Sequence, residues 1–317
     1  MTTWLPAFQI IFLSLFLQGI PFLLIGSFLG AAISVFVPIR SLASRLPKSK
    51  IGGILIGTFA GLLIPSCECI GVPLVRRLIR NGLPPATAIA YLLASPVLNP
   101  VCLASTWIAF QYDNPLMAVL TRAGGAAFLA VSVALIFSRL PVGNIFRSGI
   151  VANDEPAGEA GLWENPPAAW LANKTPRLAA AISTGFSDFF GIAVYYLLGC
   201  LIAAVVQTAL PPYAIPNTSP ALLIPGFMGL SVITSLCSSA DAFVAKSFAG
   251  YPLAALFAFM WLGAVLDLKL IFIYQSVFKR RTVLLLALLL AALVFALSLL
   301  AAYLPLERLF YGTTISG

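Results

Sequence analysis

The amino-acid sequence predicts an all-α integral membrane protein made of two inverted repeats, each with three transmembrane helices and one re-entrant helical hairpin. Three observations support this prediction. Hydrophobic residues make up 61% of the 317 residues and charged residues only 9%, whereas soluble domains carry about 25% charged residues. Several apolar runs are long enough to cross a bilayer. The two halves of the chain also present similar motifs in the same order.

Six apolar stretches are expected to cross the membrane. A spanning helix needs about 20 residues, and four runs exceed this length without interruption, while two more are polar near their middles. The uninterrupted runs are 5–37, 116–138, 178–208 and 281–303, and the interrupted ones are 84–110 and 251–277. The first run is too long for a signal-peptide core and lacks a basic start, so we expect it to be retained.

Two further stretches, 51–80 and 221–249, each contain an apolar arm, a polar break and a shorter arm. The breaks read Pro-Ser-Cys-Glu-Cys at 65–69 and Ser-Leu-Cys-Ser-Ser at 235–239. Because each arm is too short to cross a bilayer alone, each stretch is either a re-entrant hairpin or one broken span. The second alternative gives a protein with eight transmembrane helices.

Basic residues indicate which connections face the cytoplasm, where Lys and Arg gather. They lie on both sides of the first broken stretch, at 40–50 and 76–80, and also at 139–177 and 279–281. By contrast, the connection at 210–220 is uncharged and the turn at 111–115 holds only Asp113. This pattern favours six full spans, both termini outside, and two hairpins that enter from opposite faces.

The chain divides into a first transmembrane repeat at 1–140, a cytoplasmic linker at 141–176 and a second repeat at 177–317. The linker is rich in Pro, Gly, Asn and acidic residues, a composition typical of partly disordered segments. Between the repeats, Cys67 aligns with Cys237 and Asn99 with Asp267. An odd number of spans in each half reverses the second half, as in many secondary transporters, whose sites lie between broken helices near the midplane.

The cysteines at the two breaks are the first candidates for substrate binding. If the hairpins meet, two or three thiols converge near the bilayer centre, where thiolates suit Cu(I), trivalent arsenic or sulfane sulfur. Cys102 and Cys200 lie inside apolar runs, so we expect them to be packing residues. A Cys67–Cys237 disulfide is the redox alternative. The candidate substrate-binding residues are Cys67, Glu68, Cys69, Cys237, Ser238, Ser239, Asp241, Asn99 and Asp267.

The acidic candidates enter this set because ionisable groups inside a membrane are costly and usually functional. Pairing of an Asp with Lys246 or Lys269 explains them equally well. The second arms begin near 70–72 and 239–241, where free backbone NH groups and nearby serines would hold an anion, although simple packing of the hydroxyls is an equal alternative. The chain has no histidine, and we expect no metal site, no cofactor and no catalytic residue.

Glycines at 52–53, 57, 61 and 124–125 are expected to allow close helix packing. We expect no role for them in chemistry.

The run from Cys67 to Arg80, followed by Gly-Leu-Pro-Pro at 82–85 and Ala-Ser-Pro-Val-Leu-Asn-Pro at 94–100, resembles the ArsP-like predicted permease family, the relatives of organoarsenical efflux permeases. The run at 235–245 resembles the second motif of that family, except that Ser239 stands where an acid is usual. The resemblance implies a multi-pass permease of a prokaryotic inner membrane. Its expected solute is thiol-reactive or sulfur-containing: a persulfide, a thiosulfate-like anion or a trivalent organoarsenical.

Two other classes of function are weighed against a permease. A membrane-embedded thiol oxidoreductase would use two redox-active cysteines and an electron-carrying partner, and a receptor or assembly subunit would transport nothing. We expect a transporter rather than an enzyme. Its expected partners are the lipid bilayer and a small molecule, and assembly into a homo-oligomer is a further alternative. The basic residues sit in short connections rather than on an aromatic-rich face, so no nucleic acid is expected.

Overall fold

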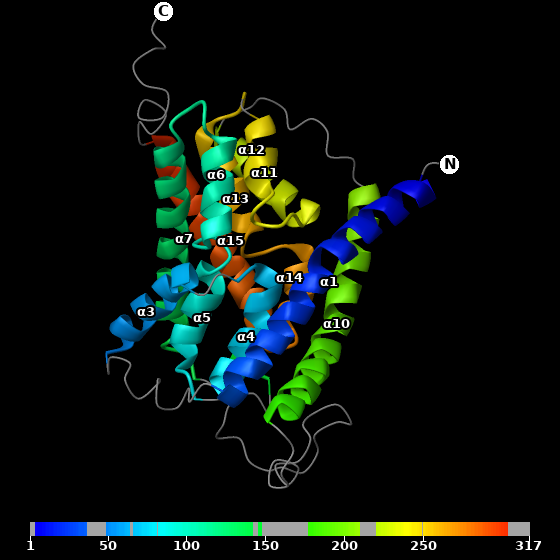
Figure 1. The fold of residues 1–317 in the computed structure, drawn as a ribbon. Coiled ribbons are helices and arrows are strands. Elements are labelled where there is room, and N and C mark those ends of the chain that lie inside the picture. Colours follow the sequence, from blue (N-terminus) through cyan, green and yellow to red (C-terminus); the bar gives the residue numbers. More distant parts are fainter. Residues whose placement is uncertain are drawn as a thin grey trace, which may run out of the picture.

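The computed structural model describes residues 4–36, 49–63, 66–80, 82–141, 145–147, 177–209, 220–248 and 250–303. Within these ranges the chain forms α-helices joined by turns, with one isolated β-bridge (Figure 1). Four segments are long and apolar enough to cross a membrane: Pro115–Phe137, Gly185–Val205, Leu253–Tyr274 and Arg280–Tyr303. The prediction of an all-α integral membrane protein is thereby confirmed.

The helices of the first half are α1 (Trp4–Phe36), α3 (Lys50–Leu63), α4 (Glu68–Arg80), α5 (Pro85–Ala94), α6 (Pro100–Ala109) and α7 (Pro115–Phe137). Those of the second half are α10 (Arg177–Ala209), α11 (Pro220–Thr234), α12 (Asp241–Ser247), α13 (Leu253–Gly263), α14 (Leu268–Tyr274) and α15 (Arg280–Tyr303). Among the described helices of each half, one of 33 residues comes first, four short ones follow, and one of 23 or 24 residues ends the series.

The two predicted spans with polar middles each consist of two helices. Residues 95–99 separate α5 from α6, and residues 264–267 separate α13 from α14. The side chain of Asn99 caps α6 by accepting a hydrogen bond from the Val101 amide, and Asp267 caps α14 by accepting one from the Leu270 amide. Such caps satisfy amides that begin a helix, so these polar residues start new helices within otherwise apolar runs.

The short helices occupy opposite ends of the molecule. In Figure 1, α3, α4 and α5 lie in the lower half, while α11, α12 and α13 lie in the upper half. Within each half the packing is similar, because α3 and α4 contact α5 as α11 and α12 contact α13. Contacts also join the halves: α1 lies along α10, α4 contacts α14, and α12 contacts α6.

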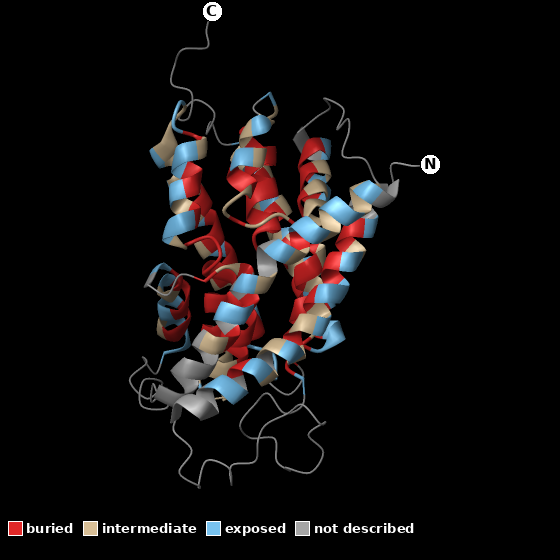
Figure 2. Ribbon diagram, turned by 45° about the vertical axis from the view of Figure 1, so that its right-hand side comes forward, coloured by how far each residue is buried: buried red, intermediate tan, exposed pale blue. Residues whose placement is uncertain are grey.

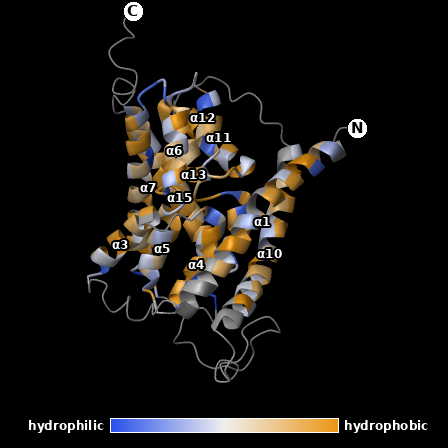
Figure 3. Ribbon diagram, in the orientation of Figure 1, coloured by the Kyte–Doolittle hydropathy of each residue, from blue (hydrophilic) through white to orange (hydrophobic). Residues whose placement is uncertain are grey.

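The outer helices present apolar side chains to the surroundings. Exposed examples include Leu13 on α1, Val194 on α10 and Leu288 on α15, and Figure 2 shows exposed residues on the outer helices around a buried centre. In Figure 3 hydrophobic colours run along the helices and hydrophilic ones gather at ends and connections. Exposure of so many apolar side chains to water is unfavourable, so this surface suits lipid.

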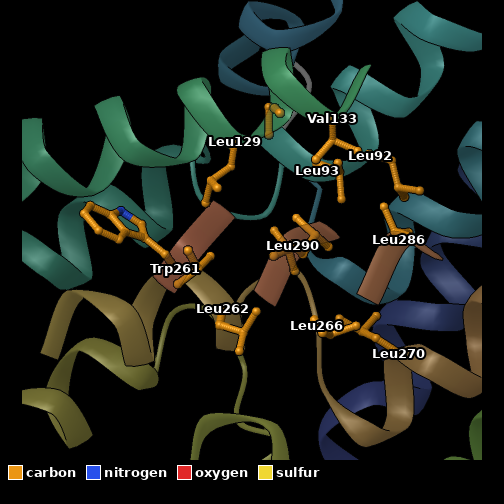
Figure 4. Packing of buried hydrophobic residues seen from close by; sticks show 14 of the residues in the cluster. Leu92, Leu93, Leu129, Val133, Trp261, Leu262, Leu266, Leu270, Leu286 and Leu290 are labelled. Atoms are coloured by element: carbon orange, nitrogen blue, oxygen red, sulfur yellow. The ribbon is translucent and has the colours of Figure 1, made fainter. Parts of the chain in front are cut away.

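The apolar core is centred on α13, all of whose residues are buried. Figure 4 shows Trp261 and Leu262 of α13 facing α7, α15 and α5, whose contributions include Leu129, Leu290 and Leu92. Some helix pairs approach closely at glycine. A Cβ atom on Gly57 would lie 2.4 Å from the Thr87 carbonyl oxygen of α5.

The distance from an added Cβ atom to its nearest neighbour also shows which of the other glycines lie at close helix contacts, as expected. Added Cβ atoms on Gly61 and Gly125 would lie 2.7 Å from Ser95 and 2.2 Å from Trp261, whereas one on Gly124 would meet nothing within 4 Å. The prediction is confirmed for Gly57, Gly61 and Gly125 and is wrong for Gly124.

Residues 145–147 of the predicted linker pack against the folded body. The Arg147 amide donates to the Val277 carbonyl at 3.0 Å, and the Lys279 amide donates to the Ile145 carbonyl at 3.2 Å. Phe146 is buried and stacks on Phe278 with ring centroids 5.3 Å apart. Apolar residues at 145–146 explain this packing. Residues 148–176, the connection at 210–219 and the basic residues at 40–48 lie outside the described residues.

Candidate functional site

The two breaks that carry cysteines have the same local hydrogen bonding. The Cys67 carbonyl accepts hydrogen bonds from the amides of Ile70 and Gly71, at 3.1 and 3.0 Å. The Cys237 carbonyl accepts them from the amides of Ala240 and Asp241, at 2.8 and 3.1 Å. Each cysteine therefore begins the first turn of the arm that follows it. Both side chains are half-buried, and neither forms a disulfide.

The second break also contains an unusual backbone conformation. Ser235, directly after α11, has a φ of 48°, which lies in the left-handed region that residues with side chains seldom adopt. This turn directs the Ser235 carbonyl to Lys269 of α14, whose Nζ donates to it at 2.9 Å. The break is thus attached to α14 through its main chain.

Lys269 is the centre of a buried ion cluster that joins the two halves. Its Nζ lies 3.3 Å from Oε1 of Glu68, the first residue of α4, and 3.4 Å from Oδ2 of Asp267. All three residues are at most 4% exposed. Asp267 also caps α14 through Oδ1, which accepts from the Leu270 amide at 2.6 Å. We call Glu68, Asp267 and Lys269 the acidic cluster.

A second buried ion pair links α7 with α12. Nη2 of Arg122 contacts both carboxylate oxygens of Asp241, at 2.6 and 2.8 Å, and donates to the Ser238 carbonyl at 2.7 Å. Nη1 donates to Thr106 Oγ1 at 2.7 Å, and the Arg122 carbonyl accepts from the indole NH of Trp261 at 3.2 Å. Because Arg122 and Asp241 are almost fully buried, each depends on the other for its charge to be compensated.

Three hydroxyl groups meet beside the first break. Tyr91 Oη donates to Ser66 Oγ at 3.0 Å, and Ser66 Oγ donates to Ser95 Oγ at 2.8 Å. Ser66 directly precedes Cys67, while Tyr91 and Ser95 belong to α5 and the turn after it. The chain of hydroxyls satisfies polar groups that would otherwise be buried without partners, and it fixes the first break against α5.

Electrostatic interactions connect the thiols with the acidic cluster. Cys67 interacts electrostatically with Glu68, and Cys237 interacts electrostatically with Glu68 and Lys269. Glu68 therefore stands within electrostatic range of the cysteines of both breaks. In the described residues no group of three or more His, Cys, Asp or Glu side chains is arranged to hold a metal ion.

The remaining candidates from the sequence fall into distinct places. Ser239 Oγ contacts the Cys237 sulfur at 3.5 Å, and the Ser238 carbonyl accepts from Arg122 and from the Cys102 thiol. Asn99 caps α6 and takes no part in the ion pairs described above. The side chain of Cys69 lies outside the described part of the chain. Pairing of acidic candidates with a lysine is confirmed for Lys269, which contacts Glu68 and Asp267. Lys246 pairs with Asp113, which is not one of the candidates.

Arg122 is the main residue that the sequence analysis missed. It is a single cation inside the apolar run 116–138, and an ionisable group at such a position is a functional candidate by default. The sequence therefore contained a signal for Arg122. It contained none for the pairing with Asp241, because nothing in the sequence relates residue 122 to residue 241. Thr106 and Trp261, which complete the network, carry no signal of their own.

Comparison with known proteins gives a consistent family. Residues 5–303 match the family of predicted permeases designated ArsP_1. The UPF0718 protein YcgR of Bacillus subtilis is 34% identical over 296 residues, which is 92% of this chain and 95% of that protein. A Streptococcus mutans protein, provisionally named as a subunit of a two-component membrane permease complex, is 32% identical over 279 residues, covering 86% and 88% of the two chains.

The UPF0718 protein YraQ of Escherichia coli is 33% identical over 79 residues, 25% of this chain and 23% of that one. No solved structure matches the chain. The relatives are bacterial, and the family match covers both halves and both cysteine breaks. The chain therefore belongs to the ArsP_1 family of predicted permeases and is a multi-pass transporter of a prokaryotic membrane.

Proposed function

We propose that this permease moves a small thiol-reactive or sulfur-containing solute through a central site formed by Cys67 and Cys237. The solute class comprises persulfides, thiosulfate-like anions and trivalent organoarsenicals. The observation that carries the proposal is the equivalence of the two cysteines: each is half-buried, forms no disulfide and begins the second arm of a broken helix.

The surroundings of these thiols support a route for a solute. Broken helices leave main-chain groups without helical partners, and at membrane depth such groups persist only inside protein or beside water. Both thiols are half-buried, whereas the ion pairs nearby are almost fully buried. At the breaks the thiols are therefore more accessible to a solute than these charged groups. Soft ligands of this kind suit arsenic(III) and sulfane sulfur.

We further propose that the halves are inverted repeats, with α3–α4 and α11–α12 as hairpins that enter from opposite faces. Each of these helices is short: α3 and α11, the longest, rise only about 21 to 23 Å, less than the roughly 30 Å of a bilayer core. The opposite placement of the two hairpins in Figure 1 supports this arrangement. Movement of one half against the other would then open the central site first to one side of the membrane and then to the other.

The experiment is uptake into proteoliposomes of the purified full-length chain, with thiosulfate, glutathione persulfide and a trivalent organoarsenical tested separately. We expect at least one of them to enter faster than into protein-free vesicles. Cys67→Ala and Cys237→Ala are each expected to lower that uptake to the protein-free level. Cys200→Ala is the matched control, because Cys200 likewise forms no disulfide but lies buried on α10, and it should keep the activity of the parent.

Normal uptake by both Cys67→Ala and Cys237→Ala, with the variants eluting as folded protein, would exclude the thiol route. A different outcome would identify a membrane thiol oxidoreductase: reversible oxidation of Cys67 and Cys237 with electron transfer and no solute flux.

The Streptococcus mutans relative also bears on partners. By similarity to that provisionally named complex subunit, we propose that the chain assembles with a second membrane subunit. Native mass spectrometry of the protein purified from its own membranes is expected to show one additional polypeptide of fixed stoichiometry. A chain that runs alone or only with copies of itself, and that transports at full rate when reconstituted alone, contradicts this assembly.

A further inference from the structure

The acidic cluster is electrically unbalanced. It contains two carboxylates, on Glu68 and Asp267, around the single ammonium of Lys269. The nearby Arg122–Asp241 pair is balanced in itself. The next buried cation of the described residues is Arg76, eight residues further along α4 and therefore about 12 Å from Glu68 along the helix axis. Among the described residues, one negative charge at the centre is left without a compensating partner, which is unfavourable in a low-dielectric interior.

The atoms that carry this excess charge can be identified. Glu68 Oε1 and Asp267 Oδ2 face the ammonium at 3.3 and 3.4 Å, and Asp267 Oδ1 accepts from the Leu270 amide. Glu68 Oε2 is buried and has no hydrogen-bond partner among the described residues. An ionised carboxylate oxygen without a partner is costly to bury, whereas a protonated one is not charged. Asp267 Oδ2 likewise has no hydrogen-bond partner among these residues, so one added proton on either carboxylate removes the excess charge.

Other ionisable groups around the cluster do not supply the missing positive charge. Those that interact with Glu68, Asp267 or Lys269 come from α6, α7, α10, α12 and both cysteine breaks: Cys102, Arg122, Cys200, Asp241, Cys67 and Cys237. Four of these are thiols, which are neutral when protonated, and the other two neutralise one another. The imbalance therefore stays with the acidic cluster.

We propose that Glu68 and Asp267 share one exchangeable proton beside Lys269, and that this proton drives solute movement. The second part rests on the permease function proposed above. The cluster joins α4 of the first half to α14 and, through the Ser235 carbonyl, to the second break. When the proton leaves, Glu68 is drawn to the ammonium; when it binds, that attraction weakens. Protonation thereby changes a contact between the two halves.

A proton fits this site better than a metal ion such as sodium. Hard metal cations need about six oxygen ligands at short range. Here the ammonium of Lys269 already occupies the space between the Ser235 carbonyl and the two carboxylates. A second cation placed there would be repelled by it.

The site itself is tested without any solute, by infrared difference spectroscopy of the reconstituted full-length protein between acidic and alkaline buffer. We expect a band from a buried protonated carboxyl group that titrates with pH. Glu68→Gln should abolish or strongly reduce it, and Asp267→Asn should reduce or shift it. Asp113→Asn is the matched control, because Asp113 belongs to the separate ion pair with Lys246, and it should leave the band unchanged.

If Glu68→Gln does not fold, Glu68→Asp replaces it and should shift the band without removing it. A spectrum that is the same in the Glu68 and Asp267 variants as in the parent overturns the proton site. Because this readout needs no transport, its failure is distinct from failure of the proposed permease function.

Coupling is tested with whichever of the three solutes the parent protein transports. The parent is expected to accumulate that solute when a pH gradient is applied, and Glu68→Gln is expected to lose this accumulation. Asp113→Asn should keep it. Accumulation in Glu68→Gln equal to that of the parent, or accumulation driven by a sodium gradient at equal pH on both sides, overturns the coupling.

Discussion

At the scale of single residues, the balanced ion pair of Arg122 and Asp241 is expected to be essential for stability. Arg122→Met keeps the volume of the side chain but leaves the Asp241 carboxylate buried without its cation. Loss of one partner from a buried pair costs about 3–5 kcal/mol. We therefore expect the free energy of unfolding in detergent to fall by that amount, as measured by chemical denaturation.

Two further variants separate charge from packing. The double variant Arg122→Met with Asp241→Leu removes both charges, and most of the stability should return, because apolar replacement of a whole buried pair is often neutral. Lys246→Met breaks the partly exposed pair with Asp113 and should cost no more than about 1 kcal/mol. An equal loss in Arg122→Met and Lys246→Met contradicts the importance assigned to the buried pair.

Single residues also show which parts of the candidate site the sequence can predict. Cys67, Cys237, Glu68 and Asp267 could be selected because polar or reactive groups inside apolar runs are rare and costly. Their partners could not be selected in the same way. Lys269 and Glu68 are 201 positions apart in the sequence, and Arg122 and Asp241 are 119 positions apart. Such pairings follow from the packing of α4 on α14 and of α7 beside α12, which no local pattern encodes.

At the scale of elements, neighbouring glycines on α7 provide a sharp test of the packing. A Cβ atom on Gly125 would lie 2.2 Å from the indole of Trp261, which is held by its hydrogen bond to the Arg122 carbonyl. Gly125→Ala should therefore force α7 and α13 apart, and overpacking of this kind costs about 1–3 kcal/mol. Thermal unfolding followed by tryptophan fluorescence should show a lower midpoint.

Gly124→Ala is the matched control, since nothing lies within 4 Å of the added atom. Alanine is the better helix former by about 1 kcal/mol, so this variant should unfold at the same temperature as the parent or slightly above it. Equal behaviour of the two variants contradicts the close contact between α7 and Trp261.

Helix boundaries are likewise predicted only in part from the sequence. The long helices α1, α7, α10 and α15 coincide closely with the predicted spans, because uninterrupted apolar runs of sufficient length determine them. The breaks within 84–110 and 251–277 were expected only as polar middles. What turns each into two helices is a capping side chain, Asn99 or Asp267. Whether a polar residue caps a new helix or faces a cavity depends on the backbone around it, which sequence alone leaves open.

At the scale of the whole molecule, the proposed hairpins make a prediction about sidedness. Lys50 lies at the start of α3 and Arg77 in the last turn of α4. If α3–α4 is a hairpin, cysteines placed at both positions are labelled from the cytoplasmic face by a membrane-impermeant maleimide. If the stretch is one broken span, as in the eight-helix alternative, the two positions lie on opposite faces.

Two positions near the other hairpin complete this test. Tyr112 and Ser247 are exposed in the turn between α6 and α7 and at the end of α12. Tyr112→Cys and Ser247→Cys are expected to react only from outside the cell, each compared with the unmodified parent. Labelling of Lys50→Cys and Arg77→Cys from opposite sides would contradict the inverted arrangement.

The proposed transport route requires Cys67 and Cys237 to share one site, and a short bifunctional methanethiosulfonate tests this directly. The variant used keeps only these two thiols, with Cys69→Ser, Cys102→Ala and Cys200→Ala. Intact-mass spectrometry should show a single reagent bridging both cysteines within one chain, and no bridge when either cysteine is also replaced. Two separate adducts on each chain, with no bridge at any reagent concentration, would contradict the shared site.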